Sequence, residues 1–146
     1  TGNPVTLSLD DLLRHEFARQ QRTLLLEDWV IRVVADEEKT RGGEEGSSAP
    51  DGTLCALYPY REATFFYDPT NVKEEQVEQV VTHELVHLLV EPLRDMVERL
   101  INDGRFTEKE KRLYTRWAED SLEATVTNVE RRLRRRSRVD RSRSPR

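Results

Sequence analysis

Two histidines and a glutamate stand at a spacing that can bind a metal ion and use it. His83, Glu84 and His87 form the sequence H-E-x-x-H. On a helix, residues i and i+4 lie one turn apart on the same face, so both imidazoles can reach one ion. Zinc accepts neutral imidazole nitrogens and lowers the pKa of a bound water toward about 7. Glu84, next to the first ligand, is placed to take a proton from that water. The spacing therefore predicts a zinc site with Glu84 as general base.

The third protein ligand of such a site must come from elsewhere in the chain, because a catalytic zinc normally has three protein ligands and one water. The remaining histidine, His15, lies in a distant segment. A carboxylate from the C-terminal helical region is therefore expected, and the candidates are Glu119, Asp120 and Glu123. Glu119 and Glu123 stand at i and i+4 beside an apolar stripe, so both could point at the motif helix. A solvated helix face is the commoner fate of a glutamate.

The residues around the motif predict the elements that position it. Apolar residues recur at helical spacing, and β-branched or aromatic residues form short runs. Ser8 is expected to be an N-cap, and Thr107 is expected to form a capping box with Glu110. The predicted helices cover 8–26, 73–91, 93–102 and 107–133, and the predicted strands cover 29–34, 54–58 and 63–67. Pro92 is expected to interrupt the motif helix, because it lacks an N–H and its ring clashes with the preceding turn. Residues 36–52 hold four glycines and few apolar residues, which predicts a mobile loop. The order predicts an α+β domain over 1–133 with a small, mostly antiparallel sheet on the motif helix.

The segment 83–93, His-Glu-Leu-Val-His-Leu-Leu-Val-Glu-Pro-Leu, resembles the active-site helix of the small zincin-like metallopeptidases of bacteriophages and prophages. The resemblance implies a zincin fold, a bound Zn²⁺ and hydrolysis of a protein or peptide substrate. The family's Glu-x-x-Val pattern corresponds to Glu123 and Val126, which implies Glu123 as the third ligand, with Glu119 as the alternative. The chain departs from metzincins and thermolysin downstream, because it lacks their H-x-x-G-x-x-H/D and N-E-x-x-S-D elements.

Charge is distributed unevenly along the chain. Residues 131–146 hold nine Arg and one Asp, a net charge of +8. The total is -4, so the other 130 residues carry -12. Residues 134–146 are expected to form a disordered Arg/Ser-rich tail, with weak nucleic-acid contact or docking on the acidic body as the alternatives. No apolar stretch long enough to cross a membrane and no signal peptide is visible, which predicts a cytoplasmic protein, in the host cell if phage-encoded.

The function predicted from these features is a zinc metallopeptidase that hydrolyses peptide bonds through a zinc-activated water. The alternative is a non-enzymatic zinc-binding relative that acts as a phage assembly or regulatory module. Substrate is expected to pair as an added strand along the edge formed by 54–58 or 63–67. Among weaker signals, Cys55 is expected to be a buried small apolar residue, and Trp29 and Trp117 are expected in the core.

Overall fold

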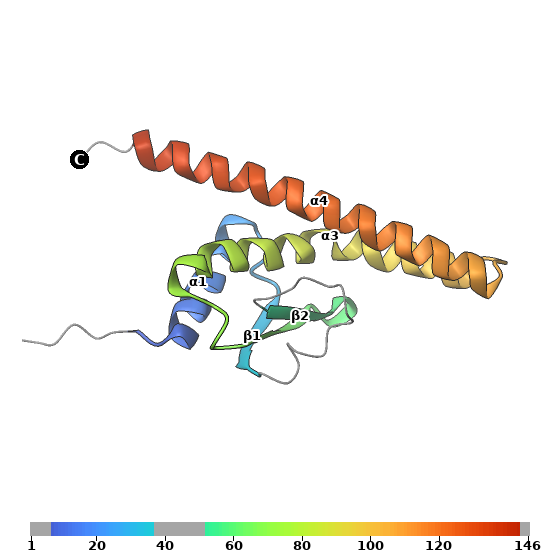
Figure 1. Ribbon diagram of the computed structural model, residues 1–146, viewed down its shortest axis with the longest axis horizontal. Coiled ribbons are helices and arrows are strands. Elements are labelled where there is room, and N and C mark those ends of the chain that lie inside the picture. The colour runs from blue at the N-terminus through green and yellow to red at the C-terminus, as the bar shows by residue number, and fades with distance from the viewer. Residues whose placement is uncertain (1–6, 37–51, 144–146) are drawn as a thin grey trace, which may run out of the picture. The chain divides into compact units, whose positions relative to one another are not determined.

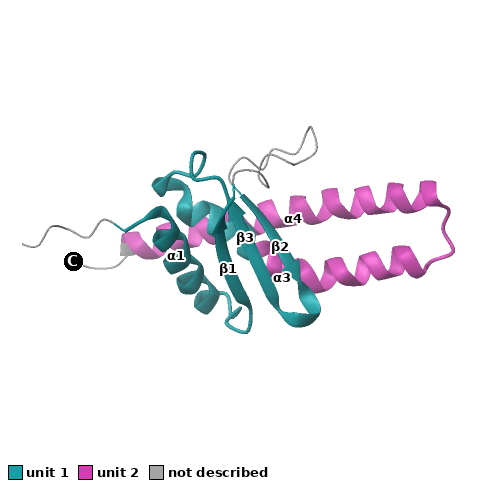
Figure 2. Ribbon diagram, turned by 90° about the horizontal axis from the view of Figure 1, so that it is seen from below, with its two compact units in different colours: residues 1–85 teal, residues 86–146 magenta. Residues whose placement is uncertain are grey.

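Helices and a small sheet make up the described part of the chain, residues 7–36 and 52–143 of this computed structural model (Figure 1). The elements are α1 (Leu9–Thr23), β1 (Val30–Ala35), β2 (Gly52–Leu57), the 3-10 turn η1 (Tyr58–Tyr60), β3 (Glu62–Tyr67), the 3-10 turn η2 (Glu74–Gln76), α3 (Val77–Asp103) and α4 (Glu108–Arg143). The predicted α+β class is confirmed. Figure 2 colours two compact units, residues 1–85 and 86–146, and the boundary between them falls inside α3.

Helix α1 begins where the sequence predicts it. The Ser8 hydroxyl accepts a hydrogen bond from the Asp11 backbone N–H at 3.2 Å, and the Ser8 N–H donates to the Asp11 carboxylate at 3.4 Å, which completes a capping box. The helix ends at Thr23, three residues before the predicted end. Leu25 takes a left-handed conformation with φ of 56°, and this turns the chain toward β1.

The sheet has the order β1-β3-β2 and mixed strand directions. Strand β2 pairs antiparallel with β3, whereas β1 pairs parallel with β3 and sets Val33 opposite Phe65. The predicted mostly antiparallel sheet is therefore wrong for β1. The short η1 connection forces β2 and β3 to be antiparallel, but no tight turn joins β1 to its neighbour. Strand β3 is central, so of the two proposed substrate edges only β2 is an edge among the described strands.

The core of the first unit joins α1 to the sheet and to the start of α3. The Phe17 and Phe65 rings lie 5.3 Å apart. Gln20 links the two helices, because it accepts a hydrogen bond from the Thr82 hydroxyl at 2.9 Å and donates to the Glu78 carbonyl at 3.1 Å. Tyr67 is buried on β3, and burial, with Asp10 nearby, raises its pKa to about 12. These contacts hold the first turns of the motif helix in place.

Helix α3 passes through Pro92 without ending, so the predicted division into helices 73–91 and 93–102 is wrong. A proline inside a helix removes one backbone hydrogen bond and costs about 3 kcal/mol. The helix continues because apolar residues lie on both sides of the proline, and Ile101, two turns farther on, is buried. The predicted helix start, Lys73, is the N-cap of η2, and the α-helix begins four residues later.

Helix α4 begins with the predicted capping box. The Thr107 hydroxyl accepts a hydrogen bond from the Glu110 N–H at 3.3 Å, and the Thr107 N–H donates to the Glu110 carboxylate at 2.8 Å. The helix continues to Arg143, ten residues beyond its predicted end, so 134–143 of the predicted disordered tail are helical. Arginine is a good helix former, and positive charge at a helix C-terminus is stabilised by the helix dipole.

Three further predictions concern single residues, and a fourth concerns a loop. Trp29 is in the core as predicted, with 6% of its surface exposed. Trp117 is 57% exposed and Cys55 is exposed, so both predictions of burial are wrong. Cys55 lies on the exposed side of the alternating strand β2. The predicted mobile loop lies outside the described residues, apart from its first and last positions.

None of the described helices has the length and apolar character needed to cross a membrane.

Candidate metal centre

The motif histidines lie on one continuous helix. His83 and His87 are separated by four residues within α3, which places their side chains about one turn apart on the same side. Neighbouring apolar residues Val81, Leu85 and Leu88 are almost completely buried, so the backbone that carries the two imidazoles is fixed. Both imidazoles are partly exposed. The helix therefore presents a pair of nitrogen donors that solvent can reach.

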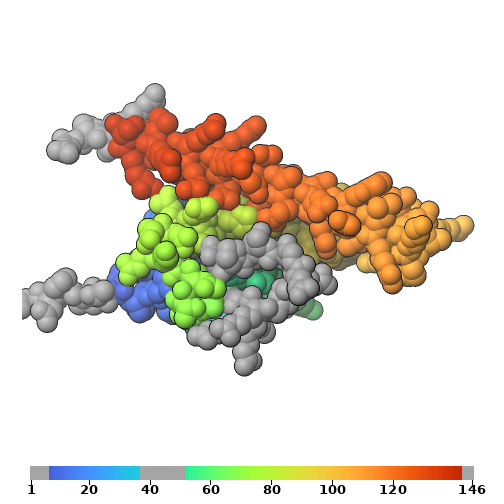
Figure 3. Space-filling model, in the orientation of Figure 1, coloured from blue at the N-terminus to red at the C-terminus, as the bar shows by residue number. Residues whose placement is uncertain are grey.

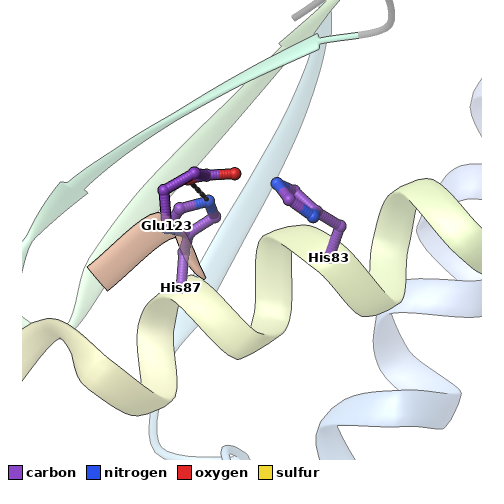
Figure 4. Close-up of side chains that lie close together, drawn as sticks. All are labelled: His83, His87 and Glu123. Atoms are coloured by element: carbon purple, nitrogen blue, oxygen red, sulfur yellow. Dashed lines mark ion pairs between the residues drawn. The ribbon is translucent and has the colours of Figure 1, made fainter. Parts of the chain in front are cut away.

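A carboxylate from α4 completes the group. The Glu123 Oε2 atom lies 3.2 Å from the His87 Nε2 atom. One ligand atom from each of His83, His87 and Glu123 lies within 4.8 Å of the other two. Figure 4 shows these three side chains pointing toward one another. Among the described residues, these three form the group of histidine and carboxylate side chains that could hold a metal ion.

The separation between the His87 and Glu123 donor atoms is compatible with a shared zinc ion. Two donors about 2.05 Å from a tetrahedral zinc ion are separated by roughly 3.3 Å. The observed separation of 3.2 Å between His87 and Glu123 is close to that value. The same distance also suits a hydrogen bond from His87 to the carboxylate. The donor set, two imidazoles and one carboxylate, is one of the sets that catalytic zinc sites use.

The other predicted ligands do not join this group. Glu119 and Asp120 are exposed on α4. His15, which the sequence does not predict as a ligand, is exposed on α1. Within the described ranges, none of them belongs to the set of converging donors. The structure thus brings Glu123, rather than Glu119, to the two histidines. Glu84 follows His83 directly on α3 and is half-buried, about 100° around the helix from it.

Glu91 is a residue that the sequence analysis overlooked. It follows His87 by four residues on α3 and thus extends the row of His83 and His87 by one more turn. Its side chain is 12% exposed, and burial raises the pKa of its carboxyl group. Arg94, 3.6 Å away, opposes that rise. The signal in the sequence is the repeated spacing of four residues, which was read only as far as the second histidine.

Comparison of the chain with protein-family models, curated proteins and solved structures found no match. The candidate site is therefore supported by the chemistry and geometry of its own residues, His83, Glu84, His87 and Glu123.

Proposed function

We propose that the chain is a zinc-dependent metallopeptidase of zincin type, with His83, His87 and Glu123 as the zinc ligands. The observation that carries the proposal is the convergence of these three donors within 4.8 Å, with Glu84 next to the first of them. Two donors come from a single helical turn of α3, and the third comes from a helix that is remote in sequence.

The chemistry divides between the ion and the chain. When bound, zinc supplies a Lewis acid that polarises the scissile carbonyl and lowers the pKa of a coordinated water. Glu84 accepts the proton of the attacking water and returns it to the leaving amine. His83, His87 and Glu123 hold the ion and leave a fourth position for water and substrate. Strand β2, an edge of the described sheet, could pair with an extended substrate.

The alternative is a zinc-binding module without catalytic activity. Structural zinc sites are closed by four protein ligands, whereas catalytic sites keep one position open. The described residues offer three converging donors, and the Glu123 side chain is 55% exposed. This open arrangement, together with the carboxylate of Glu84, favours the enzyme.

Metal content tests the site itself. We expect one zinc per chain by mass spectrometry of the purified protein, and loss of that zinc in His83→Ala and His87→Ala. Glu123→Ala should weaken binding by about 10-fold to 100-fold or more, since one of three ligands is removed. Glu119→Ala and His15→Ala are matched controls that should keep full zinc content. A wild-type protein that binds no zinc when zinc is supplied, or equal loss in Glu119→Ala, would contradict the ligand assignment.

Peptide hydrolysis tests the reaction. Glu84→Gln keeps the size and shape of the side chain but removes its basicity, so it should retain zinc and lose about 10²-fold to 10⁴-fold in kcat. A fluorogenic peptide library with random sequences provides the readout, since the proposal specifies no substrate sequence. Wild-type protein with full zinc and no hydrolysis of any library member would favour the binding module. Hydrolysis by Glu84→Gln at the wild-type rate would show that another residue is the general base.

A further inference from the structure

The last turns of α4 form a cationic helix that the proposed peptidase does not use. Between Glu130 and Arg143 the helix contains eight arginines, one aspartate and one glutamate, a net charge of +6. The segment is helical to Arg143, so its charges have fixed positions along an axis. In Figure 3 this end of α4, coloured red, lies at the surface of the face shown.

Five of these arginines have no carboxylate partner among the described residues. Arg134 lies 3.7 Å from the Glu130 carboxylate, as an i, i+4 pair. In the part of the chain that the structure describes, no carboxylate pairs with the five exposed side chains of Arg131, Arg132, Arg135, Arg136 and Arg138. Some exposed arginines elsewhere do have carboxylate partners, as Arg19 has with Glu16 and Arg99 has with Asp95. Single unpaired arginines such as Arg105 and Arg116 also occur among the described residues, but the C-terminal part of α4 differs in gathering five of them within eight residues. The described acidic residues therefore leave this part of the helix uncompensated.

The arginines also follow one side of the helix. Arg131, Arg134, Arg135 and Arg138 stand at i, i+3, i+4 and i+7, so their side chains form a row. From 131 to 141 the helix rises about 15 Å. Duplex DNA carries about one charge for each 1.7 Å of its axis, so a row of this length can meet several phosphates. Guanidinium groups suit this contact because one guanidinium can donate two parallel hydrogen bonds to the oxygens of one phosphate.

Other polyanions fit the segment less well. Residues 131–143 contain no aromatic side chain on which the bases of a single strand could stack. Their apolar residues are Leu133 and Val139, too few for the apolar face that membrane-surface helices need. The major groove of A-form RNA is too narrow for a helix, whereas the major groove of B-form DNA, about 12 Å wide, admits one.

We propose that residues 131–141 of α4 bind duplex DNA, with the exposed arginines contacting phosphates along the major groove. Contacts to phosphate carry no sequence information, so binding is independent of sequence. Residues 1–130 carry a net charge of -12 and are repelled by DNA. DNA binding is therefore confined to this helical end.

Fluorescence anisotropy of the full chain with a labelled 25-base-pair duplex tests this proposal, with salt varied from 50 to 200 mM. The triple variant Arg131→Gln, Arg135→Gln and Arg138→Gln should bind about tenfold more weakly or worse. The slope of log affinity against log salt should decrease by about 2.7, since each phosphate contact contributes roughly 0.9. Glutamine is a good helix former, and circular dichroism should show unchanged helix content.

A second triple variant is the matched control, with Arg19, Arg61 and Arg99 changed to glutamine. It removes the same charge from exposed arginines that pair with carboxylates, and it should bind DNA like the wild type. Equal weakening by both triple variants would overturn the assignment to α4. Tighter binding to single-stranded DNA, to duplex RNA or to anionic phosphatidylserine vesicles would overturn the choice of duplex DNA. A large difference between two unrelated duplex sequences would overturn the phosphate-only contact.

Discussion

The two stretches of α3 on either side of Pro92 have a similar helical pattern of apolar residues but differ in how many of those residues are buried. Before the proline, Leu85 is fully buried and Leu88 is 1% exposed. After it, Leu93 is 48% exposed and Leu100 is 62% exposed. The histidines of the motif lie in the first stretch. Hydrophobic spacing thus predicts the helix but not which part of it is covered, and the motif histidines lie in the stretch with more of its apolar residues buried.

The largest effect should follow from truncating the buried stretch. Leu85→Ala removes three buried carbon atoms and leaves a cavity, so we expect a loss of about 3 kcal/mol in the free energy of unfolding. Urea denaturation followed by circular dichroism measures the change. Zinc affinity should fall as well, because the turn that carries both imidazoles loses its packing. A loss below about 1 kcal/mol would mean that the side chains around Leu85 move in to fill the cavity. This stretch would then be less rigid than its burial indicates.

A smaller effect should follow from restoring the hydrogen bond between the two stretches. Pro92→Ala returns an N–H to the helix interior and removes the clash of the ring with the preceding turn, so we expect a gain of about 1 to 3 kcal/mol. Thermal unfolding of the two proteins under identical conditions provides the comparison. A loss of stability would instead show that the bend imposed by the proline is needed for packing, and the second stretch would then depend on it.

Much of the site could be predicted from the sequence, because its chemistry is local. His83, Glu84 and His87 lie within five residues, so helical geometry alone sets how the two imidazoles stand. Glu123 is different, since the spacing of α4 allowed Glu119 equally well. The family resemblance favours Glu123, and the three-dimensional structure brings the Glu123 carboxylate to 3.2 Å from His87. The choice among residues one turn apart depends on the rotation of α4 about its axis, which no local pattern determines.

For the fold, as for the site, local features could be predicted from the sequence and long-range ones could not. Caps made by Ser8 and Thr107 are local, and both are confirmed. The parallel pairing of β1 is not local, because no tight turn fixes its direction, and the sequence analysis gave it wrongly. Pro92 was overestimated as a helix breaker, since packing on both sides can outweigh a penalty of about 3 kcal/mol. Trp117 was assigned to the core by its type, although its ring lies against Tyr114 and is more than half exposed.

The smallest effect tests the exposed stretch with the same chemical change. Leu100→Ala removes the same atoms as Leu85→Ala, on the same helix, but at a side chain that is 62% exposed. We expect a change in the free energy of unfolding within about 0.5 kcal/mol, since alanine also has the higher helix propensity. The difference between the two leucine variants, measured in one set of urea titrations, is then about 2.5 kcal/mol, and it isolates burial from helix propensity. A loss above 1 kcal/mol at Leu100 would show that this face is covered in solution. Repeating the titration at tenfold different protein concentrations then decides whether a second chain covers it, because only that contact makes stability depend on concentration.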